Sequence, residues 1–260
     1  METNNIKINP KWSKSKDEIW DEIFANLETK QTSPKKKRLA IWQYAAAAVA
    51  AVLIVGTSFA YLYTTTETAE RGSHLAITLP DGSNVNLNAE SKLSYKPYWW
   101  FASRDVKLEG EAYFEVKSGS KFTVLSGQNE VNVLGTSFNI FARAEKYSVT
   151  CLTGKVEVVA NRDKVVLTPN MQATLNSGIF NVVETINTTQ TIGWTQNKFS
   201  FIGVPLPDVV KEIERQYDIH VSTTSTMDYL YTGNFSKEKE PEVVLEIVGK
   251  PFGITFDIEQ

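Results

Sequence analysis

Cysteine and histidine are scarce in this chain of 260 residues, and their scarcity limits its chemistry. The single cysteine, Cys151, cannot form a disulfide within the chain, and its place in an alternating stretch predicts a small buried apolar residue. The two histidines, His74 and His220, are not spaced with Cys, Asp or Glu as metal ligands are. We therefore expect no metal, no cofactor and no catalytic site for an external substrate.

An overall excess of basic residues is also missing. The net charge is -3 and the pI is about 5.6, which argues against direct binding of nucleic acid. The charge is uneven, because residues 1–38 contain nine Lys or Arg against six Asp or Glu, and the remainder contains 18 against 24. The two parts of the chain therefore suit different surroundings.

The longest feature is an uncharged run of 25 residues, 39–63. As a helix it would be about 37 Å long, enough to cross the roughly 30 Å hydrocarbon core of a bilayer. Four basic residues at 35–38 precede it, and residues 64–73 contain only one, so the positive-inside rule places the N-terminus in the cytoplasm. A cleaved signal peptide and a buried core helix fit less well, because 38 residues precede the run and it has no polar side. Aromatic residues lie near both of its ends, as in a membrane aromatic belt: Trp42, Tyr44, Tyr61 and Tyr63.

An amphipathic helix is predicted before this run, with Ser15 and Glu18 forming a capping box at its start. Residues 1–38 are too few to bury an apolar face in a core of their own, so this face needs a protein groove or a membrane surface. Its acidic residues argue against an anionic lipid surface, and a marginal helix without a specific partner stays open. The apolar residues at helical spacing are Ile19, Trp20, Ile23, Phe24 and Leu27.

After a Thr-rich connector over 64–73, residues 74–180 alternate between strand patterns and tight turns about every ten residues, which predicts an all-β unit. The stretch 106–117 alternates throughout, with Glu109 and Glu111 on its polar face, where we expect them to be solvated. The pattern is compatible with a sandwich-like, a jelly-roll-like or a β-solenoid arrangement. The fold class expected for the whole chain is therefore mainly β, behind a single transmembrane helix.

The alternation slips by one residue within "VLGTSFNI", 133–140. Apolar residues occupy odd positions at Val131 and Val133 and even positions from Phe138 onward, which predicts a β-bulge at 134–136 around Gly135. A bulge would bring the Thr136 hydroxyl next to the preceding carbonyl, where threonine can act as a nucleophile. A bulge that only bends the sheet is the alternative.

A polar linker, 181–193, leads to a last unit over 194–260 with a different pattern. Strand and helix patterns alternate there in the order βαββαβ, which predicts a small α+β module. Its edge strands offer backbone groups to a partner strand. Its first helix has one apolar face: Leu206, Val209, Val210, Ile213 and Tyr217.

Several consecutive motifs carry a family resemblance: "ITLPDGSNVNLNAESKLSY", "RDVKLEGEAYFEVK", "FTVLS", "VNVLGTSFNI", "LTGKVEVV" and "LTPNMQATL". In this order they closely resemble the FecR-type transmembrane anti-sigma regulators of Gram-negative bacteria. The C-terminal stretch "FSFIGVPLPDVVKEIERQYDIHV" resembles the secretin/TonB short-domain-like module that often follows. Together the matches span about two-thirds of the chain. The chain resembles the branch common in Bacteroidota, because its stretch "WSKSKDEIW" is similar to the short cytoplasmic segment of that branch.

The resemblance implies a single-pass protein of the inner membrane with a cytoplasmic N-terminus and periplasmic C-terminal domains. It implies that the cytoplasmic segment binds an extracytoplasmic-function sigma factor. It also implies that the periplasmic part receives a signal from the N-terminal domain of an outer-membrane TonB-dependent transporter. Some members cleave themselves at a Gly-Thr bond by an N-to-O acyl shift, and the pair Gly135 and Thr136 matches that position. The alternative function is a membrane-anchored periplasmic scaffold or envelope-binding protein without a sigma partner.

Overall fold

The computed structural model describes residues 11, 13–28, 41–144, 146–161, 163–184 and 188–259, without the side chains of 26–28 and 189. The basic cluster at 35–38 and the first two residues of the apolar run lie outside these residues. The described part of the chain is mainly β, and one long apolar helix precedes its β domain, which confirms the expected fold class.

The first helix, α1 (Lys16–Glu28), begins with the predicted capping box. The Glu18 backbone N–H donates to Ser15 Oγ at 3.3 Å, and the Ser15 N–H donates to Glu18 Oε2 at 2.9 Å. These two bonds satisfy donors that the helix itself leaves without partners. Lys14 adds an ion pair with Glu22 at 2.7 Å.

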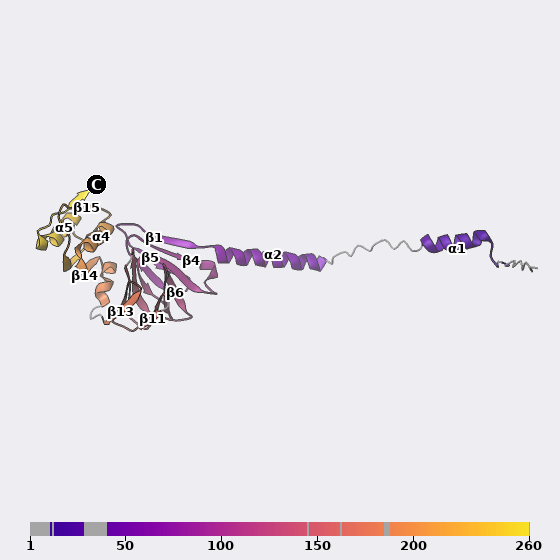
Figure 1. Ribbon diagram of the computed structural model, residues 1–260, viewed down its shortest axis with the longest axis horizontal. Helices are drawn as coiled ribbons and strands as arrows, with labels where there is room; N and C mark the ends of the chain where they lie inside the picture. The colour runs from indigo at the N-terminus through magenta and orange to yellow at the C-terminus, as the bar shows by residue number, and fades with distance from the viewer. Residues whose placement is uncertain are drawn as a thin grey trace, which may run out of the picture. The chain divides into compact units, whose positions relative to one another are not determined.

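The second helix, α2 (Ile41–Leu62), lies within the predicted apolar run. Its 22 residues contain no buried side chain, and by length and composition it is the one helix of the described residues able to cross a membrane. A helix of this length measures about 33 Å. Figure 1 follows the chain from α2 into the first strand of the β domain.

The β domain is one nearly closed sheet of 13 strands within the described residues, and its two halves share strand β5. We call these halves sheet A and sheet B. Sheet A contains β1 (Thr65–Ala69), β4 (Ser91–Tyr95), β5 (Arg104–Glu115), β6 (Phe122–Ser126), β7 (Asn129–Val133), β10 (Val156–Ala160) and β11 (Asp163–Leu167). Sheet B contains β2 (Leu75–Thr78), β3 (Asn84–Leu87), β5, β8 (Ser137–Arg143), β9 (Lys146–Cys151), β12 (Met171–Asn176) and β13 (Ile179–Glu184).

Strand β5 passes from sheet A to sheet B at Gly110. Its residues up to Glu109 pair with β4 and β6, and its residues from Gly110 onward pair with β3 and β8. Gly110 has φ of +97°, and a Cβ there would lie 2.5 Å from Ser91 Oγ and 2.8 Å from Ser91 Cα. Only glycine therefore fits where the strand changes sheets.

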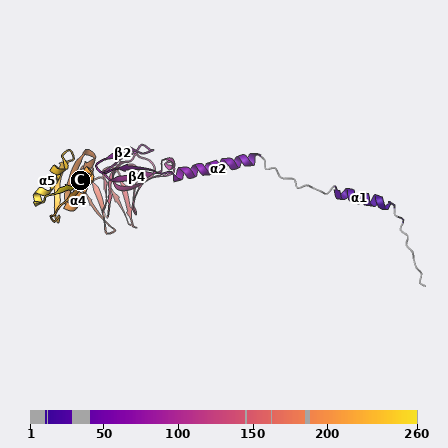
Figure 2. The ribbon, with the colours of Figure 1, turned by 90° about the horizontal axis from the view of Figure 1, so that it is seen from above.

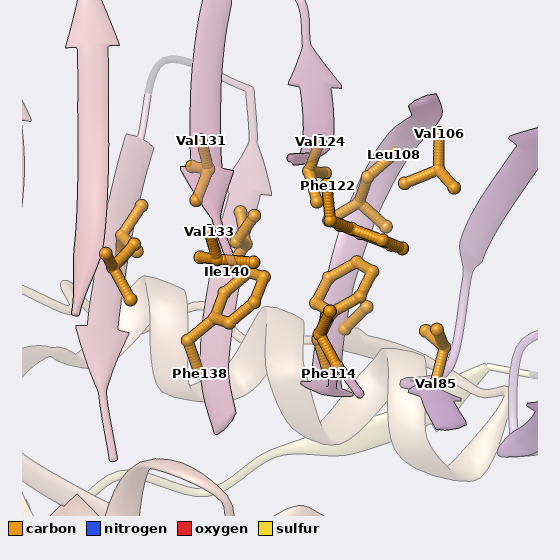
Figure 3. Packing of buried hydrophobic residues seen from close by; sticks show 14 of the residues in the cluster. Val85, Val106, Leu108, Phe114, Phe122, Val124, Val131, Val133, Phe138 and Ile140 are labelled. Atoms are coloured by element: carbon orange, nitrogen blue, oxygen red, sulfur yellow. The ribbon is translucent and has the colours of Figure 1, made fainter. Parts of the chain in front are cut away.

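Both sheets contribute to one core, which Figure 3 shows from close by. Phe114 of sheet B stacks on Phe138 with ring centroids 4.9 Å apart and lies 6.3 Å from Phe122 of sheet A. Cys151 is buried in the same core, as its alternation predicted. Full burial of an aromatic side chain contributes about 2 to 3 kcal/mol, so these phenylalanines are major contributors to stability.

The predicted bulge at 134–136 is wrong, although the phase slip behind it is real. Val131 and Val133 on β7 and Phe138 and Ile140 on β8 all point into the core. The inversion arises because β7 belongs to sheet A and β8 to sheet B, so the chain crosses between opposing sheets at 134–136. A bulge would keep both halves of the strand on the same partner.

Two expected connectors contain regular structure. Residues 64–73, expected to be a connector, include β1, whose sequence TTETA has no alternating apolar pattern but whose backbone pairs with β4. Strand β13 continues to Glu184, into the expected linker 181–193, because it forms a hairpin with β12. The same linker contains α3 (Thr188–Thr191) and the start of η2 (Gly193–Gln196).

The C-terminal module has the predicted order βαββαβ. Figure 2 shows α4 and α5 together in it. Its core combines the apolar face of α4 with α5 and four aromatic strand residues, Phe199, Phe201, Tyr231 and Phe235. The elements are β14 (Lys198–Pro205), α4 (Leu206–Tyr217), β15 (His220–Ser222), β16 (Leu230–Ser236), α5 (Pro241–Gly249), η3 (Lys250–Phe252) and β17 (Asp257–Glu259).

Candidate functional site

The apolar face of α1 is the first candidate site. Trp20, Ile23 and Phe24 are 50%, 45% and 55% exposed, and the rings of Trp20 and Phe24 stack with centroids 5.7 Å apart. Ile19 is half-buried, and the side chain of Leu27 lies outside the described residues. Ile19, Trp20, Ile23 and Phe24 thus lie on one helix as predicted. The stacked rings of Trp20 and Phe24 are exposed on its surface. Exposed tryptophan beside phenylalanine is typical of the centre of a protein interface.

The second candidate site is the peptide between Gly135 and Thr136, at the crossover from sheet A to sheet B. Backbone hydrogen bonds hold it on both sides: Val116 N–H donates to Thr136 O at 2.9 Å, and Gly119 N–H donates to Leu134 O at 2.8 Å. These bonds fix the peptide against the turn that follows β5. The site is therefore a rigid part of the domain.

Two residues that sequence reasoning missed pack directly on this peptide. A Cβ on Gly154 would lie 2.4 Å from Thr136 Cγ2 and 3.1 Å from the Gly135 carbonyl oxygen. On the other side, a Cβ on Gly135 would lie 2.5 Å from Ser118 Oγ. Neither approach leaves a local sequence signal, because Ser118 and Gly154 belong to separate turns.

Thr136 is buried, and its hydroxyl has no hydrogen-bond partner in the described part of the structure. A buried hydroxyl without a partner costs about 1 to 3 kcal/mol, so a valine of similar shape would be the more stable choice. No carboxylate or imidazole of the described residues is hydrogen-bonded to this hydroxyl. A hollow of about 440 Å³ lies beside the peptide and is lined in part by Lys121 and Lys155.

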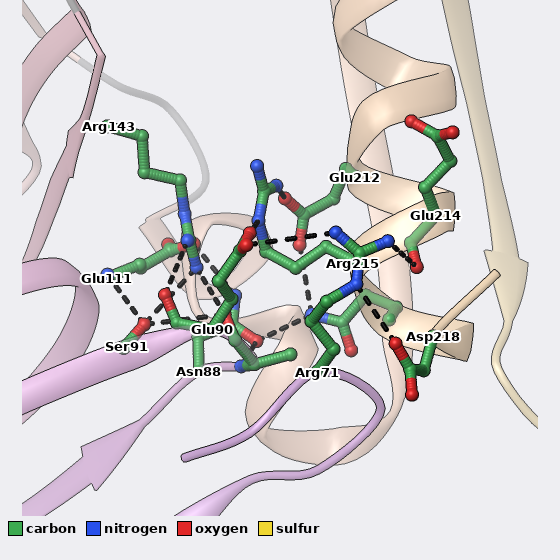
Figure 4. A network of polar contacts seen from close by, with 12 residues as sticks. Arg71, Asn88, Glu90, Ser91, Glu111, Arg143, Glu212, Glu214, Arg215 and Asp218 are labelled. Carbon is green, nitrogen blue, oxygen red and sulfur yellow. Dashed lines mark hydrogen bonds and ion pairs between the residues drawn. The ribbon is translucent and has the colours of Figure 1, made fainter. Parts of the chain in front are cut away.

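The third candidate site is the polar contact between the β domain and α4, which Figure 4 shows. The Arg71 guanidinium donates to the carbonyl oxygens of Glu214 and Ile219 at 3.0 and 2.9 Å and to Asp218 Oδ1 at 3.0 Å. Carbonyls at the C-terminal end of a helix carry partial negative charge, which attracts a guanidinium group. Arg71 therefore caps α4 and attaches the module to the segment of the β domain that directly follows strand β1.

Glu90 extends this contact. Its carboxylate accepts a hydrogen bond from Arg215 Nε at 2.8 Å and lies 3.7 Å from Arg71 Nη1. Arg215 also pairs with Glu212 of the same helix, and its carbonyl accepts a bond from the Gly72 N–H at 2.8 Å. Networks of this kind fix geometry better than isolated surface ion pairs do.

Glu111 lies at the centre of the contact, and the expectation that it is solvated is wrong. It is buried, and its two carboxylate oxygens accept bonds from Asn88 Nδ2 at 2.8 Å and Asn139 Nδ2 at 2.9 Å. Gln216 of α4 donates to Asn88 Oδ1, so the module lies over this face of sheet B. Loss of water, with the nearby Glu212 carboxylate as a further cause, raises the pKa of Glu111 to about 7.

His74 joins the same contact from β-domain residues just before β2. Its Nε2 lies 2.9 Å from Gln216 Oε1, and its ring meets Trp194 edge to face at 5.4 Å. Burial lowers the pKa of His74, which favours the neutral imidazole. Among the described residues, no three His, Cys, Asp or Glu side chains converge as metal ligands do.

Comparison with known proteins agrees with this architecture. Two crystal structures, each of a candidate anti-sigma factor from Parabacteroides distasonis ATCC 8503, are similar to the chain, both with 29% sequence identity and a TM-score of 0.69. One alignment covers 76% of this chain and 99% of the other, and the second covers 75% and 100%. No curated protein sequence matches the chain.

Two family models match the chain, FecR protein over residues 64–157 and FecR, C-terminal over residues 198–260. The first includes the peptide at Gly135 and the strands β1 to β9, and the second includes the α+β module. Together they cover more than half of the sequence. The chain therefore belongs to the FecR family of anti-sigma regulators.

Proposed function

We propose that this protein is a single-pass anti-sigma regulator of the inner membrane. Its N-terminal segment binds an extracytoplasmic-function sigma factor in the cytoplasm. Its β domain and module receive a periplasmic signal from the N-terminal signalling domain of a TonB-dependent outer-membrane transporter. The open aromatic face of α1, on the N-terminal side of a helix able to cross a membrane, is the observation that carries the proposal.

The α1 face suits a sigma factor better than a lipid surface. Asp17, Glu18, Asp21 and Glu22 occupy the same helix, and anionic headgroups would repel them. A helix of 13 residues is marginal by itself, so docking on a protein groove would supply most of its stability. Trp20 and Phe24 lie one turn apart and are the natural anchors of such a helix.

Capture of sigma factors by the full-length protein in detergent tests this role. We expect one extracytoplasmic-function sigma factor to be retained selectively, and Trp20→Ala or Phe24→Ala to weaken its binding by about tenfold or more. Asp21→Ala, on the same helix and exposed, is the matched control and should bind as the wild type does. Unchanged capture in both aromatic variants would show that α1 is not the binding element. Absence of any sigma-factor capture would favour the periplasmic scaffold.

The module is the proposed receiver for the transporter domain. Strands β14 and β16 pair only with each other among the described residues, so each keeps one edge free for a partner strand. Ile202 and Leu230 are exposed on these two strands. Binding of the isolated transporter domain to residues 64–260, measured by calorimetry, should fall when Leu230→Asp places a charge at this edge. Equal affinity of wild type and variant would exclude this edge as the binding site.

A second proposed activity is self-cleavage between Gly135 and Thr136. The Thr136 hydroxyl, buried and without a partner, supports it. Its oxygen would add to the Gly135 carbonyl carbon, the C–N bond would break, and the Thr136 nitrogen would take up the proton. Hydrolysis of the resulting ester consumes one water and leaves a Gly135 carboxylate and a free Thr136 amine. The pairing of β5 with β8 would hold the two fragments together.

Denaturing electrophoresis of the purified protein tests this reaction. We expect two fragments, 1–135 and 136–260, with Thr136 at the new N-terminus. Thr136→Ser keeps a hydroxyl and should still cleave, whereas Thr136→Val should stay intact and fold at least as stably. A single band from the wild type after prolonged incubation, identical to that of Thr136→Val, would exclude self-cleavage.

A further inference from the structure

The loop between β4 and β5, residues 96–103, carries four consecutive aromatic side chains. Trp100 packs inward, with its ring 6.0 Å from that of Phe122 in the core. Tyr98 and Phe101 instead are 56% and 83% exposed. An outward cluster of aromatic residues, held in place by an inward one, marks a contact surface.

This loop lies against the C-terminal end of α2. The ring of Tyr98 is 5.1 Å from Tyr63 and 6.0 Å from Phe59, and the ring of Trp99 meets Tyr61 edge to face at 5.4 Å. Phe59 and Tyr61 belong to the last turn of the helix, and Tyr63 follows it directly. The contacts therefore hold the loop beside the point where α2 ends.

The end of α2 sets the depth of the loop. A helix of 22 residues without a charged side chain just spans the hydrocarbon core, so its last turn lies at the boundary with the headgroups. Tyrosine and tryptophan are the side chains that favour this boundary, because they combine an apolar ring with a polar atom. Lys96, whose Nζ lies 3.8 Å from the centroid of the Tyr61 ring, can extend its ammonium group to the lipid phosphates.

We propose that residues 96–103 insert into the headgroup region of the leaflet from which α2 emerges, as a second membrane contact of the β domain. The occupant of this surface is the bilayer, because the surface is continuous with the membrane-spanning helix and has the composition of a membrane interface. Only two residues separate α2 from β1, too few for a flexible stalk. The domain is thus held against the membrane at two points.

The inference rests on α2 crossing a bilayer and not on sigma-factor binding, so the two proposals fail separately. Site-specific labelling of the full-length protein tests it in nanodiscs of phosphatidylethanolamine and phosphatidylglycerol. Phe101→Cys, at a position that is largely exposed, carries an environment-sensitive fluorophore. Cys151 is buried and should take no label under native conditions, which the wild type verifies.

Two further positions calibrate the measurement. Leu62→Cys, at the end of α2, reports the depth of the membrane boundary, and Ile202→Cys, in the module, reports a position away from it. With lipids that carry a nitroxide quencher near the headgroup, position 101 should show at least about half the quenching seen at position 62. Position 202 should show almost none.

Two results would overturn the proposal. Quenching at position 101 as weak as at position 202 would place the loop in water. A label at position 101 that is shifted to the blue but insensitive to the lipid quencher would show that a second protein copy covers the loop. Strong quenching at position 101 supports insertion of the loop into the membrane. It does so even if the Trp20→Ala and Phe24→Ala variants capture the sigma factor as the wild type does.

Discussion

Titration of Glu111 makes the stability of residues 64–260 depend on pH. Burial raises the pKa of this carboxyl to about 7, above its ordinary value of 4.5, so the folded state holds the proton more tightly than the unfolded state does. Stability is then complete below about pH 4.5 and falls as pH rises through 7. The opposite trend would apply to a carboxyl with a lowered pKa.

The size of the effect follows from the same values. A rise from 4.5 to about 7 corresponds to roughly 3 kcal/mol of stability lost well above pH 7. Glu111→Gln has the shape of the protonated acid and carries no charge. Asn139 Oδ1 has no partner, so a flip of this amide lets it accept a hydrogen bond from the new side-chain amide. The new amide donor at position 111 then has an acceptor in Asn139, so we expect the variant to fold.

Urea unfolding of residues 64–260 measures this difference. The similar Parabacteroides structure aligns over 99% of its own length with 76% of this chain, so we expect this fragment to fold without α1 and α2. Between pH 5 and pH 8 the midpoint of the wild type should fall relative to that of Glu111→Gln, because the titration of His74 is common to both proteins and that of Glu111 is present only in the wild type. Glu109→Gln, an exposed neighbour on β5, should retain the wild-type slope. Equal slopes in wild type and Glu111→Gln would refute the assignment of the titration to this residue.

Two other substitutions test the elements that position the site. Gly110→Ala places a methyl group 2.5 Å from Ser91 Oγ at a positive φ, so it should lower the free energy of unfolding by about 2 to 3 kcal/mol in the same urea assay. A loss smaller than that caused by a glycine-to-alanine substitution in an exposed loop would contradict the close approach. Arg71→Ala removes three hydrogen bonds at the end of α4 and should speed hydrogen exchange of the α4 amides while leaving β5 protected, whereas Lys211→Ala, exposed on the same helix, should change neither. Equal protection of α4 in both variants would show that Arg71 does not fasten the module.

Local signals in the sequence predicted the local structure well. Ser15 and Glu18 are three residues apart, so their capping box depends on nothing outside the first turn of α1. The alternation on either side of Gly135 likewise identified which side chains face the core. It did not identify the cause, because a bulge and a change of sheet invert the pattern in the same way. The partners of β7 and β8 decide between them, and these come from distant strands.

The polar contact with the module could not be predicted from local pattern. Glu111 alternates with apolar residues as any solvent-facing glutamate would, and α4, which lies over this face of sheet B, is distant in the sequence. Ser118 and Gly154 approach the Gly135 peptide from separate turns for the same kind of reason. The family resemblance pointed to the pair Gly135 and Thr136, but the unpartnered hydroxyl required the structure.

Burial of Glu111 beneath the contact with α4 also links its titration to the position of the module. A partner that draws α4 away returns water to Glu111, and its pKa then falls back toward 4.5. At pH 8 release of the module therefore gains the ionisation free energy that burial withholds, whereas at pH 5 it gains little. From pH 5 to pH 8 the apparent affinity of such a partner for the wild type should rise relative to its affinity for Glu111→Gln, because both proteins share His74 and only the wild type has the Glu111 carboxyl. A partner that binds the module in place would show the same pH profile with both proteins, so calorimetric titrations of the two distinguish displacement of α4 from simple docking.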